Sequence, residues 1–359
     1  MASENVTLRN GERMQIERLL PPMDTFGGRV RTWEPLQDDL FGGALAETLY
    51  TPYFVGIIDG DYAGSLGYYV PFDTRDVGIV EFVATEDRHR RKGVADVLMG
   101  RMLQEFVANG GQALHLCTTN PVAGHLYENH GFWYRVGDGM RFSAADADDF
   151  DATYLAFDGE PIVRDAVWGD LPRAAILYNM REPAWLLKEV LDNCLRDTRY
   201  EYHFARLKLR VENAQGAMLV LATPKNRVVG QTVFVRRDTF PQQHVATLSL
   251  RVAPAYLDHA VTLLRAAVDR AHEIGVSVLE FPIAAPDEDL ADIARAAGFT
   301  QAARLPDRIR DGDAWVDLRL FELALEPPAR AFLESETYYA NRHPWHVERI
   351  ASGPETRST

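Results

Sequence analysis

The sequence contains only two cysteines, Cys117 and Cys194, among 359 residues. Two cysteines cannot build a disulfide framework, and paired CxxC ligands for zinc do not occur, so disulfide-stabilised and zinc-ribbon proteins are excluded. The sequence also lacks a run of about 18 apolar residues and a signal peptide. We therefore expect a cytoplasmic protein with no membrane partner.

Positive charge is also scarce. Lysine and arginine total 38 against 52 acidic residues, which gives a net charge of −14. No long basic cluster stands against this balance, so nucleic acid and anionic membrane surfaces are poor partners. An acidic surface would tolerate a cationic amine, although it serves solubility equally well. Only four of the basic residues are lysines, a skew typical of GC-rich bacterial genomes.

The length and the globular composition, with 47% hydrophobic and 25% charged residues, predict two domains. An irregular acidic stretch, placed at residues 146–160, marks the linker. We expect an N-terminal domain at 1–145 and a C-terminal domain at 161–326. Residues 327–359 form a tail that is expected to dock in part and to end in disorder.

Hydrophobic periodicity predicts a mixed sheet with crossover helices in the first domain. The expected strands are 53–58, 63–70, 77–85, 113–117 and 132–136, and the expected helices are 91–109 and 121–129. The second domain repeats this order, with strands 162–164, 218–222, 228–236, 246–253 and 276–281, a helix begun by Asp170, and helices 256–273 and 287–297. The same 46-residue spacing separates Thr85 from Gly131 and Val252 from Gly298, which indicates an internal duplication.

The strongest local signal is the segment 83–95, VATEDRHRRKGVA, where a strand end leads through a basic turn into an amphipathic helix. Free N–H groups at a helix N-terminus bind phosphate, and glycine lets the backbone approach the anion closely. A solvated basic helix start explains this segment alone equally well. A second element, residues 118–132 (TTNPVAGHLYENHGF), lies one strand and one helix downstream.

Together these two elements, in this order, resemble the GNAT superfamily of acyl-CoA-dependent N-acetyltransferases. The resemblance covers residues 53–142 well and, in element order only, residues 160–325. It implies an α/β fold of two tandem GNAT-like domains, each a mostly antiparallel sheet flanked by helices. Acetyl-CoA would be the cosubstrate, and no metal is implied. The sequence departs from the family at Asp87, where proline usually precedes the basic turn.

The resemblance also assigns the residues that would bind the cosubstrate. The turn that would hold the pyrophosphate consists of Arg90, Arg91, Lys92, Gly93, Val94 and Ala95. Backbone groups of Val83 and Thr85 would pair with pantetheine, and Asn120 would contact the same arm. Tyr127 would lie near the thiol.

Acetyl transfer to an amine poses two proton problems, since the amine must lose a proton and the thiolate must leave. Glu81 is the candidate base, because strand alternation places it on one face with Val83 and Thr85. Tyr127 is the candidate acid, because a phenol with a pKa near 10 would match the thiolate. A surface glutamate and a core tyrosine are the alternatives. Cys117 is expected to be a buried structural thiol, and His89, His125 and His130 lack metal-ligand spacing.

The second copy lacks the chemical groups of the first. Aligning Val252 with Thr85 places Leu257 at the Arg90 position, Ala260 at Gly93 and Ala294 at Tyr127. We therefore expect a degenerate domain that packs on the first and completes its substrate cleft.

The predicted function is transfer of acetyl from acetyl-CoA to an amine of a small molecule. The acceptor pocket would be built from a helical segment at 21–48, the later strands and the second domain. Its candidate lining residues are Trp33, Phe41, Tyr68 and Tyr69, which core packing explains equally well. A non-catalytic acyl-CoA sensor or assembly protein, a longer acyl donor and an oxygen acceptor remain alternatives. A homo-oligomer is left open.

Overall fold

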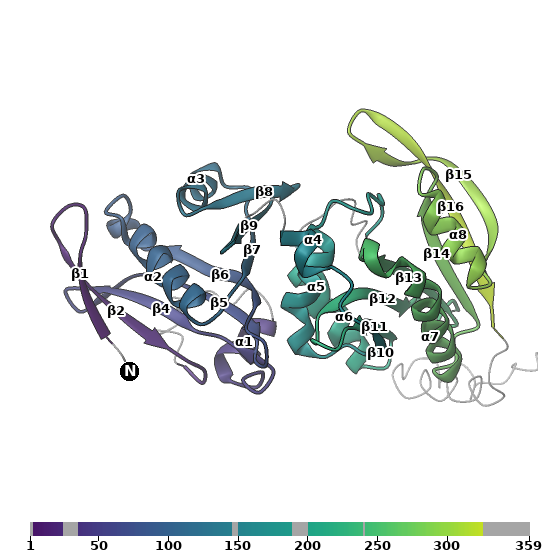
Figure 1. The fold of residues 1–359 in the computed structure, drawn as a ribbon, viewed down its shortest axis with the longest axis horizontal. Coiled ribbons are helices and arrows are strands. Elements are labelled where there is room, and N and C mark those ends of the chain that lie inside the picture. Colours follow the sequence, from purple (N-terminus) through teal and green to yellow (C-terminus); the bar gives the residue numbers. More distant parts are fainter. Residues whose placement is uncertain (1–2, 24–34, 146–149, 189–199, 240, 326–359) are drawn as a thin grey trace, which may run out of the picture.

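Two β-sheets flanked by helices lie side by side in the computed structural model, which describes residues 3–23, 35–145, 150–188, 200–239 and 241–325 (Figure 1). This arrangement confirms the predicted mixed α/β class. Within the described ranges, no helix is long and apolar enough to cross a membrane.

The first sheet has the strand order β1-β2-β4-β5-β6-β7-β9-β8, with β3 paired to β5. Its strands are β1 Ser3–Thr7, β2 Arg13–Leu19, β3 Leu49–Tyr50, β4 Tyr53–Ile58, β5 Asp61–Pro71, β6 Val77–Thr85, β7 Ala113–Cys117, β8 Phe132–Val136 and β9 Gly139–Ser143. Its helices are α1 Pro35–Gly42, α2 Val94–Ala108 and α3 Pro121–Asn129.

The second sheet has the order β10-β11-β12-β13-β14-β16-β15. Its strands are β10 Ile162–Asp165, β11 Gly216–Ala222, β12 Val228–Arg236, β13 Val245–Val252, β14 Val278–Ala284, β15 Thr300–Asp311 and β16 Ala314–Ala324. The remaining helices are α4 Phe150–Tyr154, α5 Leu171–Asn179, α6 Tyr200–Glu212, α7 Ala260–Glu273 and α8 Glu288–Ala296.

The two sheets share one topology. In each, a run of antiparallel strands, β1-β2-β4-β5-β6 or β10-β11-β12-β13, precedes a parallel neighbour, and a terminal hairpin packs its second strand beside that neighbour. Thr85 and Val252 end the equivalent strands β6 and β13, and Gly131 and Gly298 both have positive φ after the equivalent helices. The repeated spacing in the sequence therefore corresponds to repeated structural positions.

The two faces of the first sheet pack against different parts of the chain. Side chains alternate along β5 and β6, so Tyr68 and Val80 face α2, whereas Tyr69, Val77 and Ile79 face the opposite way. This second set belongs to the same hydrophobic cluster as the core of the second sheet. The two halves consequently share one core.

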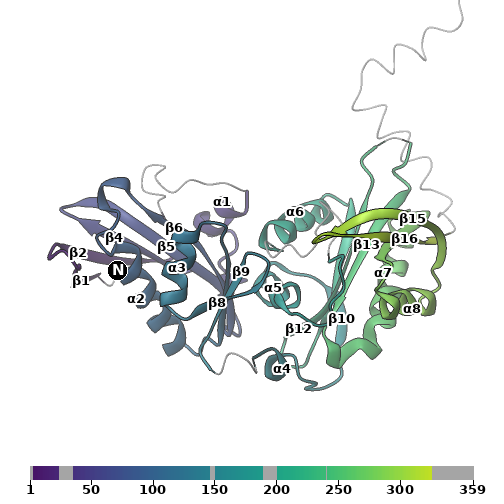
Figure 2. The same cartoon turned by 90° about the horizontal axis from the view of Figure 1, so that it is seen from above.

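Helix α5 is the element that both sheets share, and it lies between them in both views (Figures 1 and 2). It contacts β5 and β6 of the first sheet and β12 and β13 of the second. All nine of its residues are buried, including Arg173. Arg173 and Asn179 have hydrogen-bond partners within the protein, and the other residues leave no polar face for solvent, so the helix is stable only when it is covered all round.

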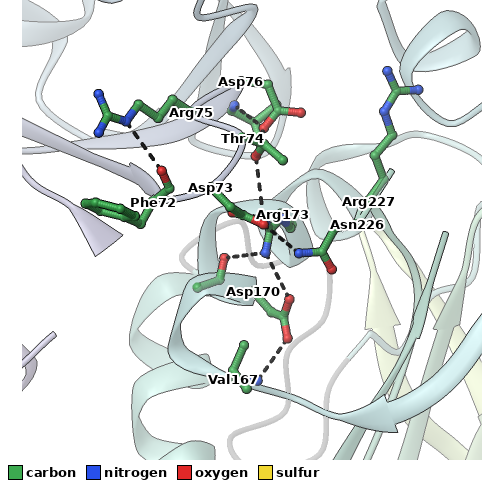
Figure 3. Close-up of polar contacts among 12 residues, drawn as sticks. Phe72, Asp73, Thr74, Arg75, Asp76, Val167, Asp170, Arg173, Asn226 and Arg227 are labelled. Carbon is green, nitrogen blue, oxygen red and sulfur yellow. Dashed lines mark hydrogen bonds and ion pairs between the residues drawn. The ribbon is translucent and has the colours of Figure 1, made fainter. Parts of the chain in front are cut away.

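Polar contacts reinforce this junction (Figure 3). Arg173 forms an ion pair with Asp73, which follows β5, and it also lies 3.4 Å from the buried carboxylate of Asp170. Asn226 donates a hydrogen bond of 2.7 Å to Asp73. Burial raises the pKa of Asp73, but hydrogen bonds from Asn226 and the charge of Arg173 outweigh it and hold the pKa below its usual value.

Several predicted elements need correction. The helix predicted from residue 91 begins at Val94, because a short 3₁₀ helix and a turn precede it. The predicted linker contains α4, whose Phe150 and Tyr154 are buried four residues apart on one helix face. The predicted helical segment 21–48 contains only α1 among its described residues.

Other differences concern elements that the sequence analysis did not include. The structure also contains β1, β2, β3, β9, α6, β15 and β16, which were not predicted. The tail 327–359, Trp33 and Cys194 lie outside the described residues.

We expect the two halves to unfold together. Replacing the fully buried Ile176 of α5 by alanine should lower the free energy of unfolding by roughly 2–5 kcal/mol, because it leaves a cavity in the shared core. Ile162→Ala is the matched control, since that side chain is 64% exposed and its loss should cost less than about 0.5 kcal/mol. Chemical denaturation, monitored by tryptophan fluorescence, measures the free energy of unfolding of both variants. Two separate transitions, with only one shifted, would contradict the shared core.

Candidate functional site

Strands β6 and β7 run in parallel but pair over only a short length. The ladder joins Val77–Ile79 to Ala113–His115. Both strands then continue, β6 as far as Thr85 and β7 as far as Cys117. Beyond Ile79, the edge of β6 that faces β7 has no strand partner within the described residues. Such an edge offers backbone N–H and C=O groups to an extended ligand.

A β-bulge interrupts β6 on its other side. Gly67 lies opposite Glu81, but Ser65 lies opposite Ala84, so Phe82 and Val83 together face one residue of β5. Phe82 has a φ of 61°, in the left-handed region.

The bulge corrects the predicted alternation of site residues along β6. Glu81 shares a face with Gly67 and Ala84, whereas Thr85 lies opposite Gly64 on the other face. The predicted common face of Glu81, Val83 and Thr85 is therefore wrong, because the inserted residue reverses the alternation.

Glu81 lies on the same sheet face as Tyr53. The residues Tyr53, Gly67 and Glu81 form a row across β4, β5 and β6. The Tyr53 ring covers Gly67, since a Cβ on this glycine would lie 2.7 Å from a ring carbon. Phe41 of α1 packs on the Tyr53 ring at a centroid distance of 5.4 Å. The partly buried carboxylate of Glu81 thus belongs to the face that α1 covers.

The basic turn before α2 has the backbone shape of an anion site. Arg91 and Gly93 have φ values of 63° and 93°, so left-handed residues alternate with Lys92. Successive N–H groups in such a sequence point into one concavity. Gly93 is the N-cap of α2, and no side chain caps the helix there. The first N–H groups of the helix therefore remain available to a ligand.

Surface carboxylates pair with three basic side chains around this turn. Arg88 binds Asp61 at 3.0 Å, Arg90 binds Asp87 at 2.8 Å and Lys92 binds Glu12 at 3.0 Å. The hydrogen bond from Lys92 lowers the pKa of Glu12. Exposed pairs of this kind contribute at most about 1 kcal/mol, so a polyanion can displace them. Arg91 is exposed and makes no ion pair with a residue in the described ranges.

Arg9 is a site residue that the sequence analysis missed. A Cβ on Gly93 would lie 3.5 Å from Cγ of Arg9, so the arginine side chain borders the turn. Its guanidinium binds Asp96 of α2 at 2.7 Å, and Asp96 also lies 3.0 Å from Nε2 of His130. Nothing in the sequence near Arg9 signals this contact, because the β1–β2 hairpin brings it from far along the chain.

Helix α3 carries the remaining predicted residues. Asn120 is its N-cap, and the Asn120 side chain accepts a hydrogen bond of 3.0 Å from the N–H of Val122. Tyr127 is 6% exposed, and its ring lies 5.9 Å from that of Phe132. Burial raises the pKa of Tyr127 to about 12. The hydroxyl makes no hydrogen bond to any described residue.

In the second half, side chains near the end of β13 and at the start of α8 bind the segment that follows α5. Asp287 is the N-cap of α8, as far beyond β13 as Asn120 is beyond β6. Its carboxylate accepts a hydrogen bond of 3.0 Å from the N–H of Leu186. Near the end of β13, the buried Arg251 donates to the carbonyl oxygens of Leu177, Met180 and Pro183.

These contacts fix residues 180–188 against β13 and α8. The β12–β13 ladder beside this segment runs without a register shift. Neither half shows a metal-binding group, since the described residues contain no cluster of three His, Cys, Asp or Glu side chains suited to an ion.

Comparison with known proteins finds a family model that matches part of the first half. Residues 17–132 match the sequence model of the acetyltransferase (GNAT) family. Curated protein sequences give no match.

Many solved structures are similar to about half of this chain. A ribosomal-protein-alanine N-acetyltransferase from Brucella melitensis is 25% identical, with a TM-score of 0.40, and the match covers 46% of this chain and 99% of that one. A putative acetyltransferase from Salmonella typhimurium, solved with acetyl-CoA, is 20% identical, with a TM-score of 0.41 and coverages of 48% and 97%. A phosphinothricin acetyltransferase from Sinorhizobium meliloti, also with AcCoA, is 16% identical, with a TM-score of 0.41 and coverages of 48% and 95%.

We expect Tyr127 to stay protonated at pH values where an ordinary phenol ionises. Burial raises its pKa, so the unfolded chain loses this proton near pH 10 and the folded chain near about pH 12. The stability linked to this proton is complete below about pH 10 and is lost as the pH rises through about 12. Ultraviolet difference titration of wild type against Tyr127→Phe tests this. A phenolate signal from Tyr127 below about pH 10.5 would show that the ring is hydrated.

Proposed function

We propose that this chain, whose residues 17–132 carry a GNAT acetyltransferase domain, binds acetyl-CoA in its first half and transfers the acetyl group to an amine of a small molecule. One observation carries the proposal. The uncapped N-terminus of α2, with its left-handed Arg91 and Gly93, follows directly on the unpaired edge of β6. An anion site and an extended-ligand site therefore adjoin, as a pyrophosphate joined to a pantetheine arm requires.

The pyrophosphate would lie on the turn 90–95, where backbone N–H groups and the positive end of the helix dipole attract it. Its charge would draw Arg90 and Lys92 from their surface partners, and Arg91 is already exposed. Backbone groups of Val83 and Thr85 would pair with the pantetheine arm along β6. The amide nitrogen of Asn120 would remain available to the same arm, because the cap uses only the side-chain oxygen.

In the proposed reaction the amine nitrogen attacks the thioester carbonyl carbon, a C–N bond forms and the C–S bond breaks. The amine must be neutral to attack, so its proton passes to Glu81, directly or through water, and then to solvent. The side of the sheet that carries Glu81 is the side that α1 covers, which supports α1 as one wall of the acceptor site.

Tyr127 acts on the leaving thiolate as a hydrogen-bond donor. A phenol with a pKa of about 12 is a much weaker acid than a thiol, whose pKa is about 8.5. Complete proton transfer to the thiolate is therefore unfavourable, and we propose hydrogen-bond donation in place of the acid role expected from the sequence. A hydrogen bond from the protonated phenol still stabilises the developing negative charge.

We propose a structural role for the second half. Its Arg251 and Asp287 side chains are bound to its own chain, and α5 covers the sheet face of the first half. The chain should therefore bind one acetyl-CoA.

Substituting the turn glycine should abolish donor binding. Gly93→Glu places a carboxylate beside the pyrophosphate, and like charges in contact cost several kcal/mol, so the affinity for acetyl-CoA should fall by roughly a hundredfold or more. Gly110→Glu is the matched control, because Gly110 also has positive φ and open space but follows the C-terminal end of α2. Calorimetric titration measures affinity and stoichiometry. Equal binding by both variants would move the donor site away from the turn.

Removing one hydroxyl separates an enzyme from a non-catalytic sensor. Tyr127→Phe should lower kcat by roughly 10- to 100-fold, the worth of one charge-assisted hydrogen bond, and leave the dissociation constant for acetyl-CoA unchanged. Tyr134→Phe is the control, since that ring is 44% exposed. Thiol release with a panel of small amines provides the rate, and product mass identifies the acyl group and the acceptor atom. Wild type that binds acetyl-CoA but turns over no amine would support the sensor.

A further inference from the structure

Phe82 adopts a backbone conformation that its side chain disfavours. Its φ of 61° lies in the left-handed region, where a bulky residue is an outlier. It is also the residue at which the register of β5 and β6 shifts. Such a conformation persists only where surrounding contacts hold it.

Two aromatic rings from other elements hold Phe82. Its ring lies 4.8 Å from that of Phe41, in α1, and 6.1 Å from that of Tyr53, in β4. Phe41 and Tyr53 also contact each other at 5.4 Å, and both are almost completely buried. We call Phe41, Tyr53 and Phe82 the aromatic triad.

Hydroxyl groups extend this support to the backbone. The Tyr53 hydroxyl donates a hydrogen bond of 2.7 Å to Oγ of Ser65, which pairs with Ala84 next to the bulge. Ser65 Oγ lies 3.4 Å from the carbonyl oxygen of Phe82, which makes a weak hydrogen bond to the bulge itself. Phe41 and Tyr53 thus contact the ring of Phe82, and Tyr53 also supports the main chain of Phe82 through Ser65.

The second half provides an internal comparison. Its equivalent strands β12 and β13 pair from Gly230 to Arg236 without a register shift. Ser249 stands as far from the end of β13 as Phe82 stands from the end of β6. The edge of β13 also lacks a strand partner beyond Thr247 within the described residues, so the bulge and the aromatic triad, which occur together in the first half, are what the equivalent strands of the second half lack.

We propose that Phe82 is a positioning residue whose ring, held by Phe41 and Tyr53, presets the β6 edge that receives the acetyl-CoA arm. This inference rests on the proposed function of the same site. It also means that α1, on the acceptor side, and β6, on the donor side, are mechanically coupled through one ring contact. Changes in α1 should therefore alter donor affinity without touching the donor.

Three leucine variants test the proposal. Phe82→Leu and Phe41→Leu each remove one ring of the aromatic triad. Phe281→Leu is the control, because Phe281 is 1% exposed and makes a comparable ring contact of 5.9 Å with Phe299 in the second half. Calorimetry gives the dissociation constant for acetyl-CoA, denaturation gives stability, and hydrogen exchange gives the protection of the peptide spanning residues 80–86.

All three variants should lose stability, but only the two triad variants should lose donor affinity. We expect a rise of roughly tenfold in the dissociation constant, equivalent to the entropy of ordering about one backbone residue. Exchange in residues 80–86 should accelerate in Phe82→Leu and Phe41→Leu and stay at the wild-type rate in Phe281→Leu. Unchanged exchange and affinity in the triad variants would overturn the proposal.

A glycine variant separates the ring from the backbone. Phe82→Gly accepts positive φ without strain, so it removes the ring while permitting the bulge. We expect it to bind acetyl-CoA about as weakly as Phe82→Leu, and wild-type affinity would refute a role for the ring. The exchange readout does not depend on the cosubstrate. If the wild-type protein binds no acetyl-CoA but exchange is still faster in the triad variants, the proposed function is overturned. The role of the ring in positioning β6 is then kept.

Discussion

The burial of α5 on all sides is the constraint on which the rest of the structure depends. A helix without a polar face has no stable position at a surface, so two sheets must enclose it. One of these sheets carries the candidate site, and its face opposite α2 would meet water without α5. The second half therefore contributes to the first as its missing layer. The second half lacks the candidate site residues of the first half, but it covers a sheet face that the first half would otherwise expose.

Within the first half, the candidate site results from two departures from regular structure. Strands β6 and β7 stop pairing after Ile79, and β6 has an extra residue in its pairing with β5 at Phe82 and Val83. Each departure alone would leave unsatisfied backbone groups, which proteins avoid unless a ligand or solvent satisfies them. In the second half β13 and β14 also stop pairing, but the bulge is absent. The bulge thus distinguishes the candidate site from its equivalent in the second half.

Sequence patterns predicted the regular parts of this fold well, because β7 and α3 have the periodicity and the end signals that local rules describe. The spacing from Thr85 to Gly131 equals that from Val252 to Gly298 because each span runs from the end of a strand to the glycine after a helix. The prediction that Glu81 shares a face with Val83 and Thr85 failed because a bulge depends on how two strands pair. The sequence of one strand alone does not determine it. Arg9 was missed because its contact with the turn depends on how the hairpin folds back. The pKa of Tyr127 was misjudged because burial by Phe132 and its neighbours is not a local property.

The ion pairs around the basic turn affect how strongly the binding of a polyanion would depend on ionic strength. Salt screens the attraction between the turn and a polyanion, with a Debye length of about 8 Å at physiological concentration. It equally screens the pairs Arg90–Asp87 and Lys92–Glu12, which compete for the same cations. The two effects oppose each other. Affinity for a phosphorylated ligand should therefore change less steeply with salt concentration than the number of basic residues suggests. The neighbouring carboxylates thus reduce the effect of salt on the electrostatic potential at the turn.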